Sequence, residues 1–448
     1  YAARSSTMPP LTWTNFAPPF SDVLPFLVLA ILMVLNAPVA YCLAIGALTF
    51  FMLGAGVPVQ TYVQRMIAAT ESFPLLAVPF FILAGVVMSE AGITGRIMRL
   101  ADAMVGHMVG GLARVNVLLS TLMGGMSGSA NADAAMQSTV LVPEMVSRGY
   151  DKAFSAAVTA FSAIITAIIP PSIGLILYGY LADVSIGRLF MAGLVPGLLI
   201  CALQLIVVGR VSRAKGYPPS RAVPASWAER GRAFMDAVWG LLIPVGILGG
   251  IRLGWYTPTE AGAIAVCYAL FIGLFVYRAL PVRRIPAMFL ETALATATIM
   301  LIICAAQAFG FFLSWERLPA QLADGMLALS QNPLVILLLI NILLIAVGTI
   351  LEGGAALIIL TPLFVPVITS LGIDPVHFGV VMVLNLTIAG VTPPVGTLMY
   401  TTCSITGVSV GAFTRSAVPL FIAMLISLVL VTYVPIISLF LPNLVYGS

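Results

Sequence analysis

The stretch GGMSGSANADAAM (Gly124–Met136) combines small polar residues with one carboxylate, although apolar segments flank it on both sides. The 448-residue chain around it is 61% hydrophobic and 8% charged, and its mean hydropathy is +1.11. The apolar runs are long enough to cross roughly 30 Å of hydrocarbon as helices, and they lack the short alternation of barrel strands. The sequence therefore predicts an all-α polytopic membrane protein.

Few residues in the sequence are suited to catalysis or to binding a transition metal. Five cysteines occur singly without a CxxC spacing, and the two histidines, His107 and His377, belong to no HExxH-type cluster. No nucleophile stands in a recognisable arrangement with a base. We therefore expect no enzymatic activity, no organic cofactor and no nucleic-acid partner.

Basic clusters orient the predicted helices in the membrane. The strongest cluster lies in 210–232 and a second one in 278–284, so the positive-inside rule places both in the cytoplasm. From these two cytoplasmic clusters we let the apolar segments cross the membrane alternately outward and inward. This predicts crossings near 24–53, 74–89, 153–180, 190–209, 237–251, 260–277, 288–314, 376–403 and 417–441. Because 24–53 carries no charge, a second crossing at the break Asn36–Pro38 stays open, and with it the side on which the N-terminus lies.

Two further apolar pieces, 115–146 and 332–370, are related to each other by an offset of 223 residues. At this offset VPEMVSRGYD (142–151) aligns with VPVITSLGID (365–374). The same offset places Gly125 on Gly348 and Pro170-Pro171 on Pro393-Pro394. One frame that covers all of these features indicates an internal repeat.

Charge distinguishes the two copies of the repeat. The connector of the first copy carries Arg148 and Lys152, whereas LGIDPVHF in the second carries no Lys or Arg. Under the positive-inside rule the copies face opposite sides of the membrane, which is the inverted-repeat pattern of many secondary transporters. The predicted divisions are an N-terminal extension 1–22, a first repeat 23–209, a cytoplasmic loop and linking helix 210–259, and a second repeat 260–448.

Glycine-rich turns at membrane depth mark the centre of each copy. Irregular backbone is tolerated in hydrocarbon only where it is buried in protein or lines a wet cavity. We therefore interpret Gly124–Asp133 and Gly348–Leu357 as the tips of two re-entrant helical hairpins. Each Pro-Pro pair breaks the following helix at the corresponding depth, because proline removes an N–H and clashes with the preceding turn.

Each tip and its Pro-Pro break together form a predicted cage of carbonyls and hydroxyls. Hard oxygen ligands suit Na⁺, and helix N-termini that point inward suit an anionic substrate. The candidate ion-binding residues are Ser127, Gly128, Ser129, Asn131, Ser172, Gly348, Glu352, Gly353, Thr392 and Thr397. The candidate substrate-binding residues are Ser129, Ala130, Asn131, Asp133, Pro170, Pro171, Gly354, Pro393, Pro394 and Gly396.

Several roles at the tips stay open from the sequence alone. Asp133 and Glu352 are the only carboxylates at tip depth, and each either caps a half-helix or serves an ion or proton site. Asn385, just before the second Pro-Pro, is interpreted as a contact between helices rather than as a ligand. The charge of an organic anion is met by helix dipoles, hydroxyls and co-bound cations, or by Arg114 or Arg188 reaching in from an edge.

The combination of motifs resembles the large membrane subunit of tripartite ATP-independent periplasmic (TRAP) transporters. The resemblance spans about residues 24–441. It rests on GGMSGSANADAAM and on three longer segments: GYDKAFSAAVTAFSAIITAIIPPSIGLILYG (149–179), GWYTPTEAGAIAVCYALFIGLFVYR (254–278) and GIDPVHFGVVMVLNLTIAGVTPPVGTLMY (372–400). The N-terminal extension through Phe20 is longer than the family pattern leads us to expect.

The resemblance implies Na⁺-coupled import of an organic acid across a bacterial inner membrane. A C4-dicarboxylate, a sugar acid or a keto acid would be the substrate. It implies two protein partners, a small membrane subunit and a periplasmic substrate-binding protein. It also implies an elevator mechanism, with a moving part of about 112–209 and 330–441 and a scaffold of about 24–105 and 237–314. The residues alone leave open a stand-alone carboxylate transporter, coupled to Na⁺ or H⁺, that needs no binding protein.

Overall fold

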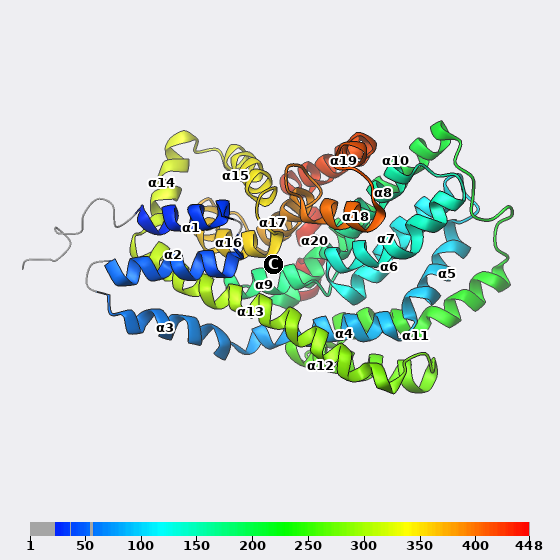
Figure 1. Ribbon diagram of the computed structural model, residues 1–448, viewed down its shortest axis with the longest axis horizontal. Coiled ribbons are helices and arrows are strands. Elements are labelled where there is room, and N and C mark those ends of the chain that lie inside the picture. The colour runs from blue at the N-terminus through cyan, green and yellow to red at the C-terminus, as the bar shows by residue number, and fades with distance from the viewer. Residues whose placement is uncertain (1–22, 36, 54–56, 448) are drawn as a thin grey trace, which may run out of the picture. The chain divides into compact units, whose positions relative to one another are not determined.

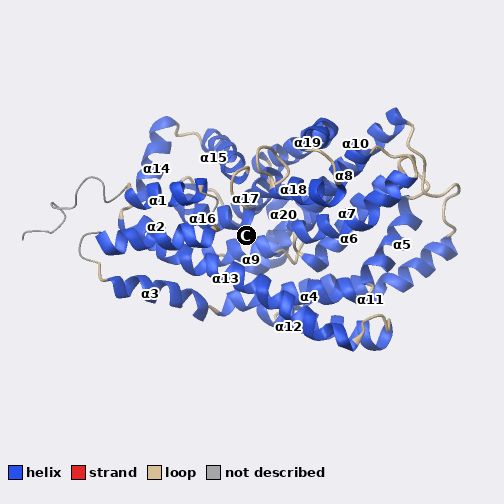
Figure 2. Ribbon diagram, viewed as in Figure 1, coloured by secondary structure: helices blue, strands red, loops and turns tan. Residues whose placement is uncertain are grey.

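The computed structural model describes residues 23–35, 37–53 and 57–447, and within these ranges it contains helices and connecting segments but no strand (Figures 1 and 2). The predicted all-helical architecture is thereby confirmed. The predicted N-terminal extension and Asn36 of the Asn36–Pro38 break lie outside the described residues.

The chain divides into two compact units, of which the first combines the described residues up to Ser72 with Ile299–Leu318. Residues 24–53, for which the sequence left one or two crossings open, form two helices that pack against each other. Phenylalanine rings join these helices to the end of α13. The ring centroids of Phe26 and Phe309 are 5.7 Å apart, and those of Phe50 and Phe312 are 5.1 Å apart. The helices of this unit are α1 (Leu24–Val34), α2 (Val39–Leu53), α3 (Val59–Ala68), η2 (Ala69–Glu71) and the C-terminal half of α13 (Ile285–Trp315).

The second unit, Phe73–Thr298 with Pro319–Ser448, holds both predicted hairpins and both Pro-Pro breaks. Its first helices are η3 (Phe73–Leu76), α4 (Ala77–Glu90), α5 (Ile93–Val105), α6 (Gly111–Ser127), α7 (Ala130–Ser147), α8 (Lys152–Ile168), α9 (Ile173–Leu181), α10 (Ile186–Lys215), α11 (Trp227–Arg252), α12 (Pro258–Phe271), η4 (Ile272–Val276) and η5 (Val282–Arg284). The start of α13 is followed by α14 (Leu318–Leu329), α15 (Pro333–Gly348), α16 (Gly353–Ser370), α17 (Pro375–Ala389), α18 (Thr397–Thr406), α19 (Val410–Tyr433) and α20 (Ile436–Tyr446).

The helix bounds follow the sequence offset of 223 residues. Adding 223 to the bounds of α7 gives 353–370, which are the bounds of α16. The same shift relates the start of α8 to the start of α17, and both helices are capped by an aspartate. Asp151 accepts a hydrogen bond from the Phe154 N–H at 2.8 Å, and Asp374 accepts one from the Val376 N–H at 2.7 Å. The repeated sequence therefore forms repeated local structure.

Each repeat contains a helical hairpin followed by a broken helix. Helices α6 and α7 are in contact and are joined by Gly128 and Ser129, whereas α15 and α16 are in contact and are joined by Thr349–Glu352. Helices α8 and α9 are bent by 45° at their break. Both Pro-Pro bonds, at 170–171 and at 393–394, are cis.

Seven of the described helical segments are long and apolar enough to cross a membrane, and the bent pair α8–α9 raises the number to eight. These segments include α16, which the sequence assigns to a hairpin arm. Length and composition alone therefore do not distinguish a hairpin arm from a crossing. The predicted last crossing, 417–441, is divided between α19 and α20, because the helix stops at Tyr433 and the next helix starts after Pro435.

The two repeats exchange contacts across the second unit. Helix α7 packs against α18, and α16 packs against α9, so each hairpin's second arm meets the broken helix of the other repeat. Helix α8 contacts α6, α7, α10, α17, α18 and α19. Almost every residue of α8 is buried, including Phe154 and Phe161. This arrangement brings parts of both repeats around one buried helix.

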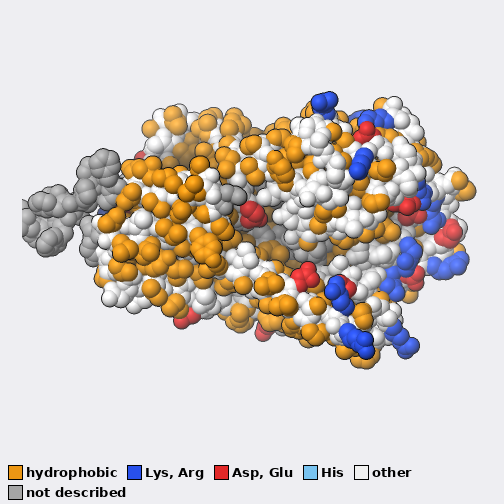
Figure 3. Space-filling view, in the orientation of Figure 1, with side chains coloured by type: hydrophobic (Ala, Val, Ile, Leu, Met, Phe, Trp, Pro, Cys, Tyr) orange, Lys and Arg blue, Asp and Glu red, His pale blue; other side chains and the backbone are white. Residues whose placement is uncertain are grey.

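Lysine and arginine gather at the end of the second unit where α5, the end of α10 and the start of α11 lie (Figure 3). A capping box starts α11, because Ser226 accepts from the Glu229 N–H and Glu229 accepts from the Ser226 N–H. Hydrogen bonding from Ser226 holds the pKa of the exposed Glu229 carboxyl below its usual range. The basic surface matches the cluster that the positive-inside rule places in the cytoplasm.

Candidate functional site

The first hairpin tip is a two-residue turn that lies against the first Pro-Pro break. Gly128 ends α6 in the left-handed region, with φ +59°, and Ser129 caps α7 by accepting from the Ala132 N–H at 3.4 Å. A Cβ atom at Gly128 would lie 2.6 Å from the Pro171 carbonyl oxygen. Both the backbone conformation and the close approach therefore require glycine at this position.

One backbone hydrogen bond joins this tip to the start of α9. The Ile173 N–H donates to the Gly128 carbonyl at 3.3 Å. The Ser172 hydroxyl donates to the Ala167 carbonyl, whose usual helical donor would be the absent N–H of Pro171, and it also accepts from the Leu175 N–H at 3.3 Å. Ser172, which the sequence proposes as an ion ligand, thus repairs the broken helix and caps the next one.

Two polar oxygens at the first tip are buried without a hydrogen-bond partner among the described residues. They are the Ser127 hydroxyl, at the end of α6, and the Asn131 side-chain carbonyl, in the first turn of α7. An unsatisfied buried polar group costs about 1–3 kcal/mol, so such a pair is expected to bind water or a ligand. Both residues are among the predicted ion-binding residues, and the buried Ala130 lies between them in the chain.

Asp133 points into the hairpin interior and does not cap α7. Only 2% of the residue is exposed, and Ser129 is the residue that caps the helix. The Ser120 and Thr166 hydroxyls each donate to Oδ2 of Asp133 at 2.8 Å, and the Gln137 amide donates to Oδ1 at 2.8 Å. The carboxylate therefore links α6, α7 and α8, so the capping role that the sequence left open belongs to Ser129.

A second layer of polar contacts continues this network along α8. The Asn116 amide donates to the Thr159 hydroxyl at 2.7 Å, and the Ser162 hydroxyl donates to the Asn116 carbonyl oxygen at 2.6 Å. The sequence interpretation named Asp133 but none of its partners. A usable signal was present, because polar residues recur three or four positions apart in these apolar helices, at 116 and 120, at 133 and 137, and at 159, 162 and 166.

The second tip is capped by its carboxylate. Glu352 is the N-cap of α16 and accepts from the Ala355 N–H at 3.0 Å, with Gly353 and Gly354 forming the first helical residues. A Cβ atom at Gly354 would lie 3.0 Å from the Glu352 carboxylate. The structure thus supports the capping alternative for Glu352 and gives the two tip carboxylates different roles.

The second tip also lies against its own Pro-Pro break. The Val395 N–H donates to the Thr349 carbonyl at 3.1 Å. A Cβ atom at Gly348 would lie 2.7 Å from the Ala389 Cβ atom. Both tips therefore meet the backbone of the break that follows them in the sequence.

The residues of the second break have mixed surroundings. The Thr392 hydroxyl donates to the Ile388 carbonyl at 2.9 Å, so it is used within its own helix turn. Gly396 is the N-cap residue of α18 and offers no side-chain cap. The Thr397 hydroxyl lies close to Gly390, since it would be 3.6 Å from a Cβ atom added there. Pro393 and Pro394 contribute carbonyls without N–H groups, as the sequence predicts.

Asn385 forms a contact between helices. Its amide donates to the Asn341 side-chain oxygen at 2.7 Å and to the Asn341 carbonyl at 3.1 Å. Asn341 donates in turn to the Thr432 hydroxyl at 3.1 Å. These bonds join α15, α17 and α19, in agreement with the interpretation of Asn385 as a contact between helices.

The two arginines considered as substrate contacts have partners elsewhere. Arg114 lies in the first turn of α6, roughly 20 Å from the tip at 1.5 Å per residue, and donates to the Val109 carbonyl at 3.0 Å. Arg188, at the start of α10, donates to the Asn443 side chain at 3.1 Å. The tips themselves offer helix N-termini, carbonyls and hydroxyls to an anion.

A family model of the DctM component of tripartite ATP-independent periplasmic transporters matches residues 26–437. A sialic acid TRAP transporter large permease protein of Vibrio cholerae is 41% identical over 92% of this chain and 96% of the relative. A C4-dicarboxylate TRAP transporter large permease protein of Pseudomonas aeruginosa is 39% identical over 89% of this chain and 92% of the relative. These relatives are permeases, which confirms the expectation that the protein is not an enzyme.

A longer relative is the isethionate TRAP transporter permease protein DctMQ of Oleidesulfovibrio alaskensis, 38% identical over 95% of this chain and 67% of the relative. Among solved structures, the YdaH transporter of Alcanivorax borkumensis is similar in fold, with a TM-score of 0.57 and 14% sequence identity over 92% of this chain and 98% of the other. At this identity the similarity concerns the fold alone.

We predict that Asp133→Ala destabilises the protein by about 1–3 kcal/mol, because three buried donors lose their acceptor. Asp133→Asn should cost less, since it keeps one side-chain oxygen. Thermal unfolding in detergent measures the difference, with Asp324→Ala on the exposed face of α14 as the control. Equal unfolding midpoints for Asp133→Ala and the control would contradict the inward-facing network.

We predict that Gly128→Ala lowers both stability and transport more than Gly254→Ala does. Gly254 shares the left-handed backbone, with φ +71°, but a Cβ atom there has no neighbour within 4 Å. The control therefore carries only the conformational cost, about 1–2 kcal/mol, whereas Gly128→Ala adds the clash with Pro171. Similar losses in the two variants, measured by thermal unfolding, would show that the tip does not lie against the break.

Proposed function

The chain belongs to the DctM component family of tripartite ATP-independent periplasmic transporters, and we propose that it imports an organic acid together with Na⁺ across a bacterial inner membrane. The observation that carries the proposal is the first tip, where the Ser127 and Asn131 oxygens are buried without a partner beside a Pro-Pro break.

The proposed Na⁺ site is the first tip. Na⁺ is a hard cation and is bound by hydroxyl and carbonyl oxygens, which are the groups that Ser127 and Asn131 present. The Gly128 turn and the break beside it add backbone carbonyls. The Asp133 network fixes both arms of the hairpin against α8, so these oxygens are held in place before the ion arrives.

The proposed substrate is an organic anion that is bound by helix N-termini. Four helices begin at the tips and breaks, namely α7, α9, α16 and α18. The Glu352 carboxylate already caps α16, so the N-termini of α7, α9 and α18 are the ones proposed to bind the substrate. The first N–H groups of a helix have no intrahelical partner and carry about half a positive charge, which together bind a carboxylate without an arginine. The matched relatives are named for sialic acid, C4-dicarboxylate and isethionate, which are all organic anions. We therefore propose a C4-dicarboxylate, a sugar acid or a related small organic anion.

We propose that the hairpins and broken helices move together as an elevator against the remaining helices. The contacts between α7 and α18 and between α16 and α9 support this, because they couple each hairpin to the other repeat. The moving part would be about 112–209 and 330–441, and the scaffold about 24–105 and 237–314.

The proposed partners are a periplasmic substrate-binding protein and a small membrane subunit. The tripartite family description and the length of the DctMQ relative, of which this chain matches 67%, support a further membrane component.

We predict that proteoliposomes with this chain and its small subunit take up the substrate only with an inward Na⁺ gradient and added binding protein. Full uptake by this chain alone would favour a stand-alone carboxylate transporter instead.

We predict that Ser127→Ala and Asn131→Ala each raise the Na⁺ concentration for half-maximal uptake by about tenfold, which corresponds to one ligand worth roughly 1.4 kcal/mol. Thr139→Ala is the matched control, because Thr139 is an exposed hydroxyl on the same hairpin, bonded to the Ala135 carbonyl. Na⁺ titration of uptake in proteoliposomes measures the effect. An unchanged Na⁺ response in both tip variants would exclude the first tip as the ion site.

A further inference from the structure

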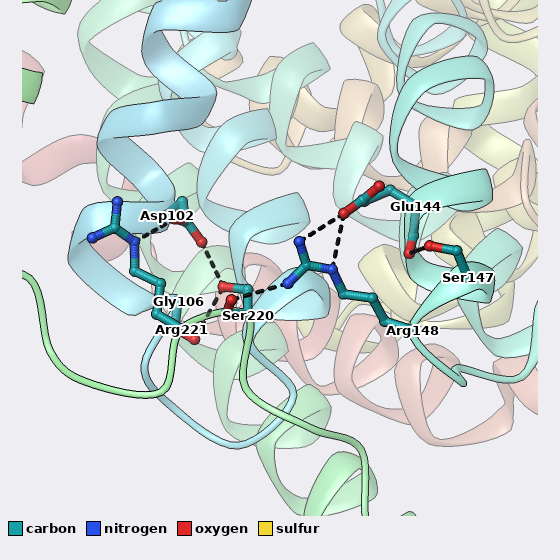
Figure 4. Close-up of polar contacts among 7 residues, drawn as sticks. All are labelled: Asp102, Gly106, Glu144, Ser147, Arg148, Ser220 and Arg221. Carbon is teal, nitrogen blue, oxygen red and sulfur yellow. Dashed lines mark hydrogen bonds and ion pairs between the residues drawn. The ribbon is translucent and has the colours of Figure 1, made fainter.

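The segment Tyr217–Arg221, which follows α10, is bonded to two different parts of the second unit (Figure 4). We call this segment the strap. On one side it contacts the end of α5 and the loop between α5 and α6. On the other side it contacts the connector between α7 and α8. Its position matters because the proposed moving part begins between these two partners.

The strap's contacts with α5 are polar. The Arg221 guanidinium pairs with the Asp102 carboxylate at 2.6 Å, and the Ser220 hydroxyl donates to the same carboxylate. The backbone N–H groups of Ser220 and Arg221 donate to the Gly106 carbonyl at 2.9 and 3.2 Å. The side chains of the ion pair are 35% and 26% exposed, so water has access to this pair.

The contacts with the α7–α8 connector are mainly aromatic and buried. The Tyr217 ring stacks on Tyr150 with their centroids 4.5 Å apart, and it lies 5.3 Å from the ring of Phe154. The Tyr150 hydroxyl donates to the Pro218 carbonyl at 2.8 Å, and burial raises the pKa of Tyr150 to about 12, so this donor stays protonated at physiological pH. Arg148 adds a bond to the Ser220 carbonyl at 2.9 Å and pairs with Glu144 at 2.7 Å.

The strap also spans the loop between α5 and α6. Helices α5 and α6 are joined by residues 106–110, where Gly110 has φ +72°. The Gly106 carbonyl accepts from the strap at one end of this loop, and the Gly110 N–H donates to the Tyr217 carbonyl at the other end, at 3.3 Å. The strap is therefore bonded to both ends of the loop.

We propose that the strap is a latch that holds the proposed moving part against α5. In each transport cycle it opens where Asp102 contacts Ser220 and Arg221. This inference rests on the proposed elevator function. Tyr217 continues from α10 and is packed in the buried aromatic contacts, so it travels with the moving part. The contacts at Asp102 and Gly106 are the ones that separate, because they are polar and water replaces the partly exposed Asp102–Arg221 pair at small cost.

A reducible crosslink across the proposed opening tests the latch. Cysteines introduced by Asp102→Cys and Arg221→Cys are joined by a short bifunctional reagent that forms a disulfide with each thiol. In this chain Cys267 and Cys304 are replaced by Ser, and the other three cysteines are buried. Uptake is measured in proteoliposomes with Na⁺ gradient and binding protein, before crosslinking, after it and after reduction. We expect the crosslink to lower uptake at least tenfold and reduction to restore it.

The matched control is the ion pair between Arg284 and Glu90, in which Nη2 of Arg284 lies 2.7 Å from Oε1 of Glu90. Both residues belong to the proposed scaffold. Glu90→Cys with Arg284→Cys, crosslinked in the same way, should transport at the rate of its reduced form. Undiminished uptake by the crosslinked 102–221 pair, or equal inhibition of both pairs, overturns the latch. Uptake by the reduced variants reports separately on the proposed function, so its failure is distinguishable from failure of the latch.

Discussion

Backbone N–H and C=O groups need hydrogen-bond partners wherever water is absent, and this constraint shapes the centre of the molecule. Each Pro-Pro pair removes two donors, and each hairpin tip ends one helix and starts another. The unpaired groups are satisfied by the neighbouring irregular segment, as the bonds from Ile173 to Gly128 and from Val395 to Thr349 show. A tip and a break therefore depend on each other, and neither would be stable in hydrocarbon alone.

The two repeats satisfy the same backbone requirement with different side chains. The residue 223 positions after Ser129 is Glu352, and both are N-caps of a hairpin's second arm. The residue 223 positions after Asp133 is Ala356, which is fully buried. Among the described residues, the buried carboxylate network thus belongs to the first repeat alone. The two repeats share their backbone arrangement, but the second hairpin has an apolar residue where the first has Asp133.

The glycine and proline residues that interrupt helices made the architecture predictable from the sequence. The 223-residue offset located both hairpins, both breaks and the ends of α7 and α16, because helix interruption is a local property of the chain. Side-chain direction was less predictable. Ser172 turns toward the Ala167 carbonyl, and Asp133 turns toward Thr166, 33 residues away, so both depend on neighbours brought by tertiary packing. Residues 24–53 carry no charge, and the positive-inside rule therefore could not decide that they form two helices.

The strap combines buried aromatic contacts with partly exposed polar ones. Buried aromatic rings, such as Tyr150 and Tyr217, lose apolar contact when they part, and water does not compensate for that loss. A partly exposed ion pair, such as Asp102 with Arg221, loses little when each group is hydrated separately. A boundary between moving and stationary parts is therefore expected to run through polar, wet contacts. In the strap, the side-chain contacts with α5 are polar, whereas the hairpin connector adds the buried rings of Tyr150 and Phe154 to its exposed Arg148 bond, so the connector side is expected to stay attached.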